Sequence, residues 1–174
     1  VTYRDIVIIM RAPSNGGSEI YDTLSKYGIP CYLERQSGYF SAWEVQITLD
    51  MLRILDNPQQ DIPLTAVLRA PFSFTNYTDE ELFIIRQLLP KSNMYECLEA
   101  VIYSEKSENA ELKKKVIYTL ETLQKLRRFA IQCPISELIL RIYQECSLLE
   151  YAEILPSGVQ RRHNLEALYD KALQ

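Results

Sequence analysis

The sequence predicts an α/β fragment with the element order βαβα, followed by an all-helical remainder that makes the chain predominantly helical. The first observation is an apolar, β-branched run from Asp5 to Met10, which is typical of a strand covered on both faces of a parallel sheet. The second is a series of helix caps, each followed by apolar residues three and four positions apart, which recurs beyond Asp61. No alternating strand pattern occurs in that later part, so we expect helices throughout it.

A turn, a helix and a second short strand follow the first predicted strand. Ser18 can cap a helix that carries Ile20 and Leu24 on one side, and Gly28 is suited to end it. The apolar run 29–33 then predicts a short strand, which completes a βαβ unit.

The second predicted helix begins at Ser41, whose hydroxyl can cap it, and ends at Asn57, because Pro58 disfavours helical geometry in the residue before it. Its apolar residues surround the helix axis almost completely. That distribution indicates burial on two sides.

The later helices are predicted from caps and apolar stripes. Thr78 and Glu81 have the spacing of a capping box. Apolar residues at spacings of three and four form the most regular stripe along 110–131. We expect helices from Thr78 to Leu89, Met94 to Tyr103, Ala110 to Ile131, Pro134 to Tyr143 and Asn164 to Leu173.

Composition places the chain among globular proteins, because 47% of its residues are hydrophobic and 24% are charged. The longest apolar runs are far shorter than the roughly 20 residues that cross a bilayer, so no membrane span is expected. The net charge of −4 does not fit a free-standing nucleic-acid binder. Any DNA contact must therefore come from a local basic patch.

The chain lacks the residues of the common metal and catalytic centres. Its cysteines form no CxxC pair and His163 is the single histidine, so we expect no metal site and free thiols in a reducing cytoplasm. No P-loop, dinucleotide-binding glycine motif or nucleophile elbow is present. Carboxylates such as Glu44, Glu80 and Glu81 are interpreted as helix-end and surface groups. We therefore expect no catalytic residue within the chain.

Two strands and two helices within residues 1–58 cannot cover both faces of a parallel sheet. An open, apolar sheet edge is also an aggregation hazard. We therefore expect the chain to be a piece of a longer protein that supplies the rest of the sheet and the catalytic residues.

The segment Tyr3–Arg11 resembles motif IV of the UvrD-like superfamily 1A DNA helicases, in which a strand of the second motor domain ends in an arginine. The likeness continues in order through Tyr27–Pro30, Ser37–Phe40, Glu44–Gln46 and Asp56–Asp61. Within that family, the later segments are most similar to the AddA branch, at Asp61–Leu64, Ala66–Pro71, Asp79–Leu82 and Leu155–Tyr169.

The resemblance implies that residues 1–58 are part of a RecA-like second motor domain and that residues 59–174 form a helical 2B-like insertion. It implies an intact ATP-dependent DNA helicase and exonuclease subunit that unwinds and processes double-strand breaks for recombinational repair. ATP and magnesium are its implied cofactors, single-stranded DNA and the duplex junction its substrates, and an AddB-like subunit its partner in the cytoplasm. The isolated fragment is expected to be inactive.

Two other functions are compatible with the residues. One is an independent helical module that binds a protein partner through surfaces rich in the chain's 12 tyrosines. The other is a UvrD-like helicase that lacks the nuclease. Neither alternative requires the AddA-like segments to be significant.

The resemblance assigns Arg11 to the γ-phosphate of ATP in the intact motor, a task that suits a planar and permanently charged guanidinium. It also implies that Arg35, Tyr39 and Phe40 lie near the DNA path, where the aromatic rings could stack on a base. From the residues alone, Arg11 is compatible with a solvated loop and the two aromatic residues with core packing.

The resemblance assigns a further DNA contact to Arg69. The segment Arg69–Thr75 corresponds to a turn through which the 2B insertion of relatives touches duplex DNA with backbone amides. The glycine that is usual there is missing, which disfavours a close approach of the backbone to phosphate. The basic residues Lys113–Lys115, Lys125 and Arg127–Arg128 could form a helix face for DNA or a simple solvated face.

Overall fold

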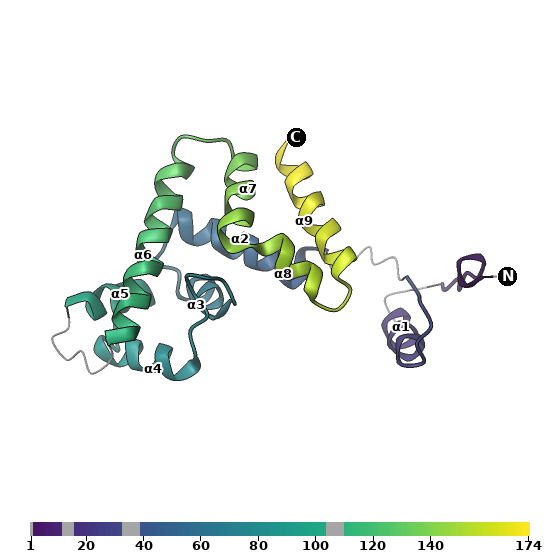
Figure 1. The fold of residues 1–174 in the computed structure, drawn as a ribbon, viewed down its shortest axis with the longest axis horizontal. Helices are drawn as coiled ribbons and strands as arrows, with labels where there is room; N and C mark the ends of the chain where they lie inside the picture. The colour runs from purple at the N-terminus through teal and green to yellow at the C-terminus, as the bar shows by residue number, and fades with distance from the viewer. Residues whose placement is uncertain (1, 12–15, 33–38, 104–109) are drawn as a thin grey trace. The chain divides into compact units, whose positions relative to one another are not determined.

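The computed structural model describes residues 2–11, 16–32, 39–103 and 110–174 (Figure 1). It divides the chain into two compact units, Val1–Ser41 and Ala42–Gln174. Every regular element among the described residues is a helix.

The two predicted strands are absent from the described residues, so the βαβα prediction is wrong. Ile6 has extended dihedral angles, φ −107° and ψ 126°, but the described residues around it pair with no other strand. Val7 and Ile9 are 77% and 89% exposed instead of being covered on both faces. Residues 29–32 form no strand either, and Leu33 lies outside the described residues. A β-branched run favours extended backbone, but a strand also needs a neighbour to pair its amide and carbonyl groups.

The first unit contains one α-helix that ends as predicted. Gly28 adopts the left-handed φ of 70°, and the Ile29 amide donates to the Leu24 carbonyl at 3.0 Å. The start of this helix differs from the prediction, because Gly16 is its N-cap and Ser18 lies within it. The elements of the unit are η1 (Tyr3–Asp5), α1 (Gly17–Lys26) and η3 (Tyr39–Ser41).

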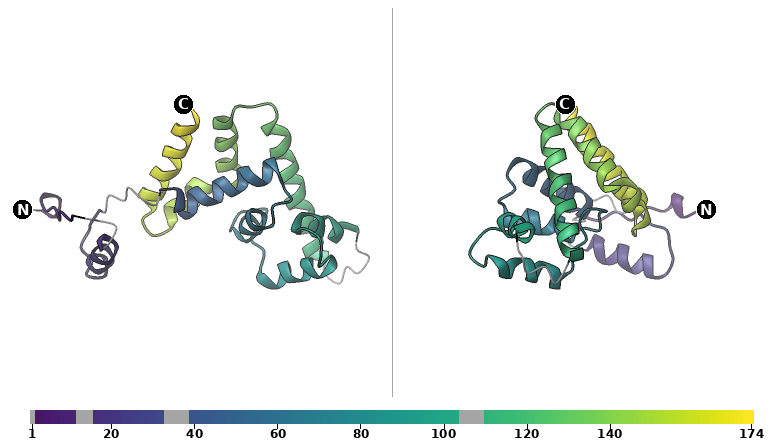
Figure 2. Two further views of the ribbon diagram at one scale, coloured as in Figure 1. Left: turned by 180° about the vertical axis from the view of Figure 1, so that it is seen from behind. Right: turned by 60° about the vertical axis from the view of Figure 1, so that its left-hand side comes forward.

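The second unit is a set of packed helices, namely α2 (Trp43–Asp56), α3 (Asp61–Arg69), α4 (Asp79–Leu88), α5 (Met94–Tyr103), α6 (Ala110–Ala130), α7 (Ile135–Cys146), α8 (Leu148–Ile154) and α9 (Gly158–Ala172). Figures 1 and 2 show α2 among the other helices, and it packs against α3, α6, α7 and α9. α6 packs against α5 and α7, and α8 packs against α7 and α9. α2 is therefore the central element of the unit.

The prediction that α2 is buried on two sides is confirmed. Val45 and Met51 are fully buried and Ile54 is 1% exposed. Fully burying a side chain of this size contributes about 1.5–3 kcal/mol relative to leaving it exposed. The helix ends at Asn57 as predicted, but its N-cap is Ala42 and not Ser41.

Most helix boundaries in this unit follow local signals. The capping box of α4 is confirmed, because the Thr78 hydroxyl accepts from the Glu81 amide at 3.2 Å and the Glu81 carboxylate accepts from the Thr78 amide at 2.9 Å. α5 and α6 also agree with the predicted ranges.

The last helix is longer than predicted, because α9 begins at Gly158 and not at Asn164. The polar residues between these two positions form no apolar stripe that could have marked the helix. A Cβ atom at Gly158 would lie 2.1 Å from the Glu153 carbonyl oxygen. The tight turn from α8 into α9 therefore requires glycine at this position.

The division between the units falls after Ser41, so α2 belongs to the helical unit. The assignment of residues 1–58 to a motor domain and of 59–174 to an insertion stays a prediction. No helix in the described parts of the chain is long and apolar enough to cross a membrane.

Candidate nucleic-acid interface

Arg69, the predicted DNA contact of the second unit, is the last residue of α3 and precedes the loop 70–78. Its side chain is 59% exposed, and its guanidinium lies 3.4 Å from the carboxylate of Asp79 at the start of α4. An ion pair this exposed contributes little to stability. The guanidinium can therefore turn to an anion at the surface at small cost.

The loop 70–78 folds back on the end of α3 without any glycine. The amides of Phe72 and Asn76 each donate to the Ala70 carbonyl at 2.8 Å. The Thr75 hydroxyl donates to the same oxygen at 2.7 Å. The path of the loop backbone is thus set by three donors that converge on one carbonyl.

Aromatic side chains anchor the loop in the core. Phe72, Phe74 and Tyr77 are buried, and the two phenylalanine rings stack with centroids 6.1 Å apart. The residues between them face solvent, namely Pro71, Ser73 and Asn76. The loop therefore presents a small polar rim on a buried aromatic base.

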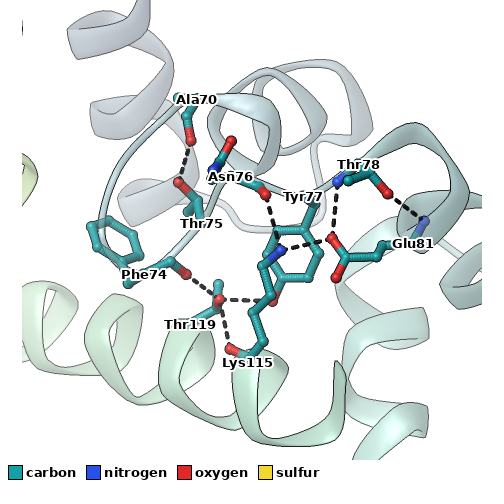
Figure 3. Close-up of polar contacts among 9 residues, drawn as sticks. All are labelled: Ala70, Phe74, Thr75, Asn76, Tyr77, Thr78, Glu81, Lys115 and Thr119. Atoms are coloured by element: carbon teal, nitrogen blue, oxygen red, sulfur yellow. Dashed lines mark hydrogen bonds and ion pairs between the residues drawn. The ribbon is translucent and has the colours of Figure 1, made fainter. Parts of the chain in front are cut away.

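Thr119 of α6 connects the loop to the helix, as Figure 3 shows. Its hydroxyl donates to the carbonyl oxygens of Phe74 and Lys115, the latter at 2.9 Å, and lies 2.8 Å from the Tyr77 hydroxyl. Since carbonyl oxygens only accept, the proton of Thr119 points to them and the Tyr77 hydroxyl must be the donor to Thr119. Burial raises the pKa of Tyr77 to about 12, which keeps that donor proton in place.

Lys115 supports the same loop from α6 (Figure 3). Its ammonium donates to the Asn76 carbonyl at 2.9 Å and to the Glu81 carboxylate at 2.7 Å, and it lies 4.4 Å from the centre of the Tyr77 ring. Asn76 has a φ of 62°, a left-handed conformation that asparagine tolerates better than most residues. Lys115 therefore braces the protein itself and is not free for DNA.

We expect Thr119→Val to destabilise the chain by about 2–4 kcal/mol, because it leaves the buried Tyr77 hydroxyl and Phe74 carbonyl unpaired at roughly 1–3 kcal/mol each. Urea denaturation followed by circular dichroism measures the loss. Thr122→Val is the matched control, since the Thr122 hydroxyl only donates to the Tyr118 carbonyl one turn earlier in the same helix. Equal losses for the two variants would contradict the bracing role of Thr119.

The residues predicted to meet nucleotide or DNA in the first unit include two aromatic neighbours. The rings of Tyr39 and Phe40 form an edge-to-face pair with centroids 4.9 Å apart. Phe40 is 55% exposed, while partial burial raises the pKa of Tyr39 to about 12. Arg11 is exposed at the end of the extended segment, and Arg35 lies outside the described residues.

The basic residues of α6 do not form one continuous free face. Lys125 donates to the Glu145 carboxylate at 2.8 Å, and the Arg127 guanidinium donates to the Leu55 carbonyl at 3.1 Å. Lys114 is exposed to solvent. The face is thus divided between internal contacts and solvated side chains.

A buried charge cluster joins α2 to α9, and sequence reasoning missed it. Glu44 is fully buried, with one carboxylate oxygen 2.5 Å from the Arg161 guanidinium and the other accepting from the Asn164 amide at 2.7 Å. The interpretation of Glu44 as a helix-end surface carboxylate was therefore wrong. Its spacing of four residues from the buried Thr48 and seven from Met51 is the signal that places it on an inward helix face.

The cysteines are all free thiols. Cys97 and Cys146 are buried, and burial raises the pKa of Cys146. A raised pKa keeps the sulfur protonated and unreactive. No three side chains of His, Cys, Asp or Glu gather as a metal site within the described ranges.

The chain is similar over nearly its whole length to proteins named as the A-type subunits of an ATP-dependent helicase/nuclease. The relative from Bacillus cytotoxicus is 41% identical over 175 residues, which cover 100% of this chain and 14% of the relative. The relatives from Oceanobacillus iheyensis and Clostridium botulinum are 39% and 36% identical over 170 and 195 residues. Those matches cover 98% and 99% of this chain but 13% and 15% of the relatives. No family model matches the chain.

Proposed function

Because the chain belongs to the AddA family of ATP-dependent helicase/nuclease subunits, of whose members it spans only 13–15%, we propose that it works within an ATP-driven enzyme that unwinds and degrades DNA at double-strand breaks. The observation that carries the proposal is the identity of 36–41% over 98–100% of the chain. Identity that extends along every helix supports a shared role within the longer protein.

ATP and magnesium are the proposed cofactors of that enzyme. Arg11 is the residue of this chain that would meet the γ-phosphate, and the support is its place at the end of a segment resembling motif IV together with its exposure. A guanidinium offers phosphate oxygens a fork of donors and stays charged at any working pH. The ligands of magnesium would come from other parts of the enzyme, because the described residues contain no cluster of carboxylates suited to it.

DNA is the proposed substrate, and the loop 70–78 with Arg69 is the proposed contact in the second unit. The support is mechanical: Thr119 and Lys115 brace the loop, so that the exposed Arg69 and Ser73 keep their positions when they meet a phosphate. Contacts to phosphate set the position of a protein on DNA without reading its sequence. The loop would therefore help to hold duplex or strand in register.

An AddB-like subunit is the proposed partner and the cytoplasm the proposed location. The support for a partner is the name of the relatives, which describes each of them as one subunit and so indicates an assembly with at least one other chain. Tyr39 and Phe40 remain proposed contacts of single-stranded DNA, since Phe40 keeps an exposed aromatic face.

The decisive experiment uses the longer enzyme that contains this chain, produced together with its partner protein. A blunt-ended duplex with a fluorophore on one strand and a quencher on the other reports unwinding, and gel electrophoresis reports degradation. We expect both to depend on ATP and magnesium. A preparation that binds DNA and hydrolyses no ATP would contradict the proposed function.

For the loop contact, we expect Arg69→Ala to weaken DNA binding by a similar factor for all sequences and to lower the slope of log affinity against log salt by about 1. Fluorescence anisotropy of a labelled duplex at several salt concentrations measures both quantities. Arg53→Ala is the control, because Arg53 is an exposed arginine of α2 that pairs with a single aspartate, as Arg69 does. A slope that changes equally in both variants would assign the effect to general charge.

A further inference from the structure

The hairpin of α6 and α7 carries a small pocket away from the loop 70–78. The pocket has a volume of about 230 Å³ and is lined by Lys125, Leu126, Arg128, Phe129, Gln132 and Arg141. Four of these residues follow one another at intervals of three and four, which places them on one face of α6 and its continuation into the turn. Arg141 completes the lining from α7.

The pocket has an excess of positive charge. Glu145 is the carboxylate paired with it, at 2.8 Å from the Lys125 ammonium and 2.7 Å from the Arg141 guanidinium. The hydrogen bond from Lys125 and the charges of both cations hold the pKa of Glu145 below its usual value, so that it stays ionised. Three cations thus share one carboxylate, which leaves room for a second anion.

Arg128 is the cation of this pocket with unused donors. Within the described part of the chain, neither its guanidinium nor the Gln132 side-chain amide has a hydrogen-bond partner. A guanidinium, an amide and the nearby Arg141 offer planar forks of donors, which match the oxygens of a phosphate.

The other wall of the pocket is apolar and aromatic. Leu126 is buried beneath it, while the Phe129 ring is 37% exposed and forms part of the lining. An exposed aromatic ring beside a phosphate-binding group is the combination on which unpaired bases stack. Bases in an intact duplex cannot reach such a ring, because both of their faces are already stacked.

The size of the pocket separates a polymer from a small molecule. Pockets that enclose a whole small-molecule ligand have volumes of roughly 300–1,000 Å³. At about 230 Å³, this pocket holds one charged group and part of its attachment. It fits one repeating unit of a longer ligand that continues over the surface.

We propose that the pocket between α6 and α7 binds one nucleotide unit of single-stranded nucleic acid, with Arg128 and Arg141 on the phosphate and Phe129 against the base. The inference rests on the proposed DNA-handling function but places a contact outside the loop 70–78 and the residues that the family resemblance implies. It makes Arg128 a phosphate ligand and Phe129 a stacking platform.

The experiment measures binding of a fluorescein-labelled oligothymidylate to the whole 174-residue chain by anisotropy across a salt series. We expect Arg128→Ala to weaken binding about tenfold, as for loss of a charged hydrogen bond, and to lower the salt slope by about 0.7. Phe129→Ala should weaken binding about fivefold or more with an unchanged slope, and Phe129→Tyr should retain the affinity because it keeps the ring.

Lys114→Ala is the matched control, since it removes one exposed cation of the same helix that does not line the pocket. Equal weakening by Lys114→Ala and Arg128→Ala would overturn the pocket proposal, as would an absence of oligothymidylate binding by the unmodified chain. Competition by polyglutamate as strong as by unlabelled oligothymidylate would also overturn it, because it would indicate a site for any anion. The proposed function fails separately, in the unwinding assay of the longer enzyme.

Discussion

Arg11→Ala is expected to lower ATP hydrolysis by the complete helicase about a thousandfold, and ATP-driven unwinding with it, while DNA binding is retained. The reason is that an arginine on the γ-phosphate stabilises charge in the transition state, an effect worth roughly 10³–10⁵ in turnover. Steady-state phosphate release in the presence of DNA measures it. Arg11 is well suited to such a role in trans, since it projects from a segment in which Val7 and Ile9 are also exposed.

Arg4→Ala provides the comparison for Arg11. Arg4 is an exposed arginine of the same unit, in the single turn η1, and lies outside the expected nucleotide contact. Its removal should leave ATP turnover unchanged. Unaltered turnover in Arg11→Ala as well would remove Arg11 from the nucleotide site.

The helices could be predicted because their signals are local. The Thr78–Glu81 capping box needs only residues three positions apart, and the apolar stripe of α6 repeats within each turn. The strand predicted at Asp5–Met10 failed for the opposite reason. Its β-branched residues describe a preference for extended backbone, whereas a sheet requires partners far away in the sequence or in another part of the protein.

The contacts that shape the candidate interface could not be predicted, because they join residues far apart in the chain. Tyr77 and Thr119 are 42 positions apart, and neither residue type signals a buried pair. Lys115 belonged to a basic run that suggested a DNA-binding or solvated face, yet it is held by Glu81 and the Asn76 carbonyl. Charge in the sequence therefore indicates which residues can bind an anion, and only packing decides which of them are free.

Arg161→Ala is expected to destabilise the chain by about 3 kcal/mol. Breaking a buried ion pair by removing one partner costs roughly 3–5 kcal/mol, and the lower end applies because Asn164 still donates to Glu44 and Arg161 is 28% exposed. With a urea dependence of about 1–3 kcal/mol per molar, the unfolding midpoint should fall by roughly 1–3 M. Arg161 also donates to the Pro156 carbonyl at 3.0 Å, so the loss should include the turn before α9.

Arg162→Ala separates burial from charge, because this neighbouring arginine pairs with Glu153 and Glu166 at the surface. We expect it to change the unfolding midpoint little. Combining Arg161→Ala with Glu44→Gln should restore part of the lost stability, since the buried group is then neutral and still accepts from Asn164. A loss from Arg161→Ala that is the same with Glu44 or Gln at that position would show that the arginine stabilises the C-terminal helix without the buried carboxylate.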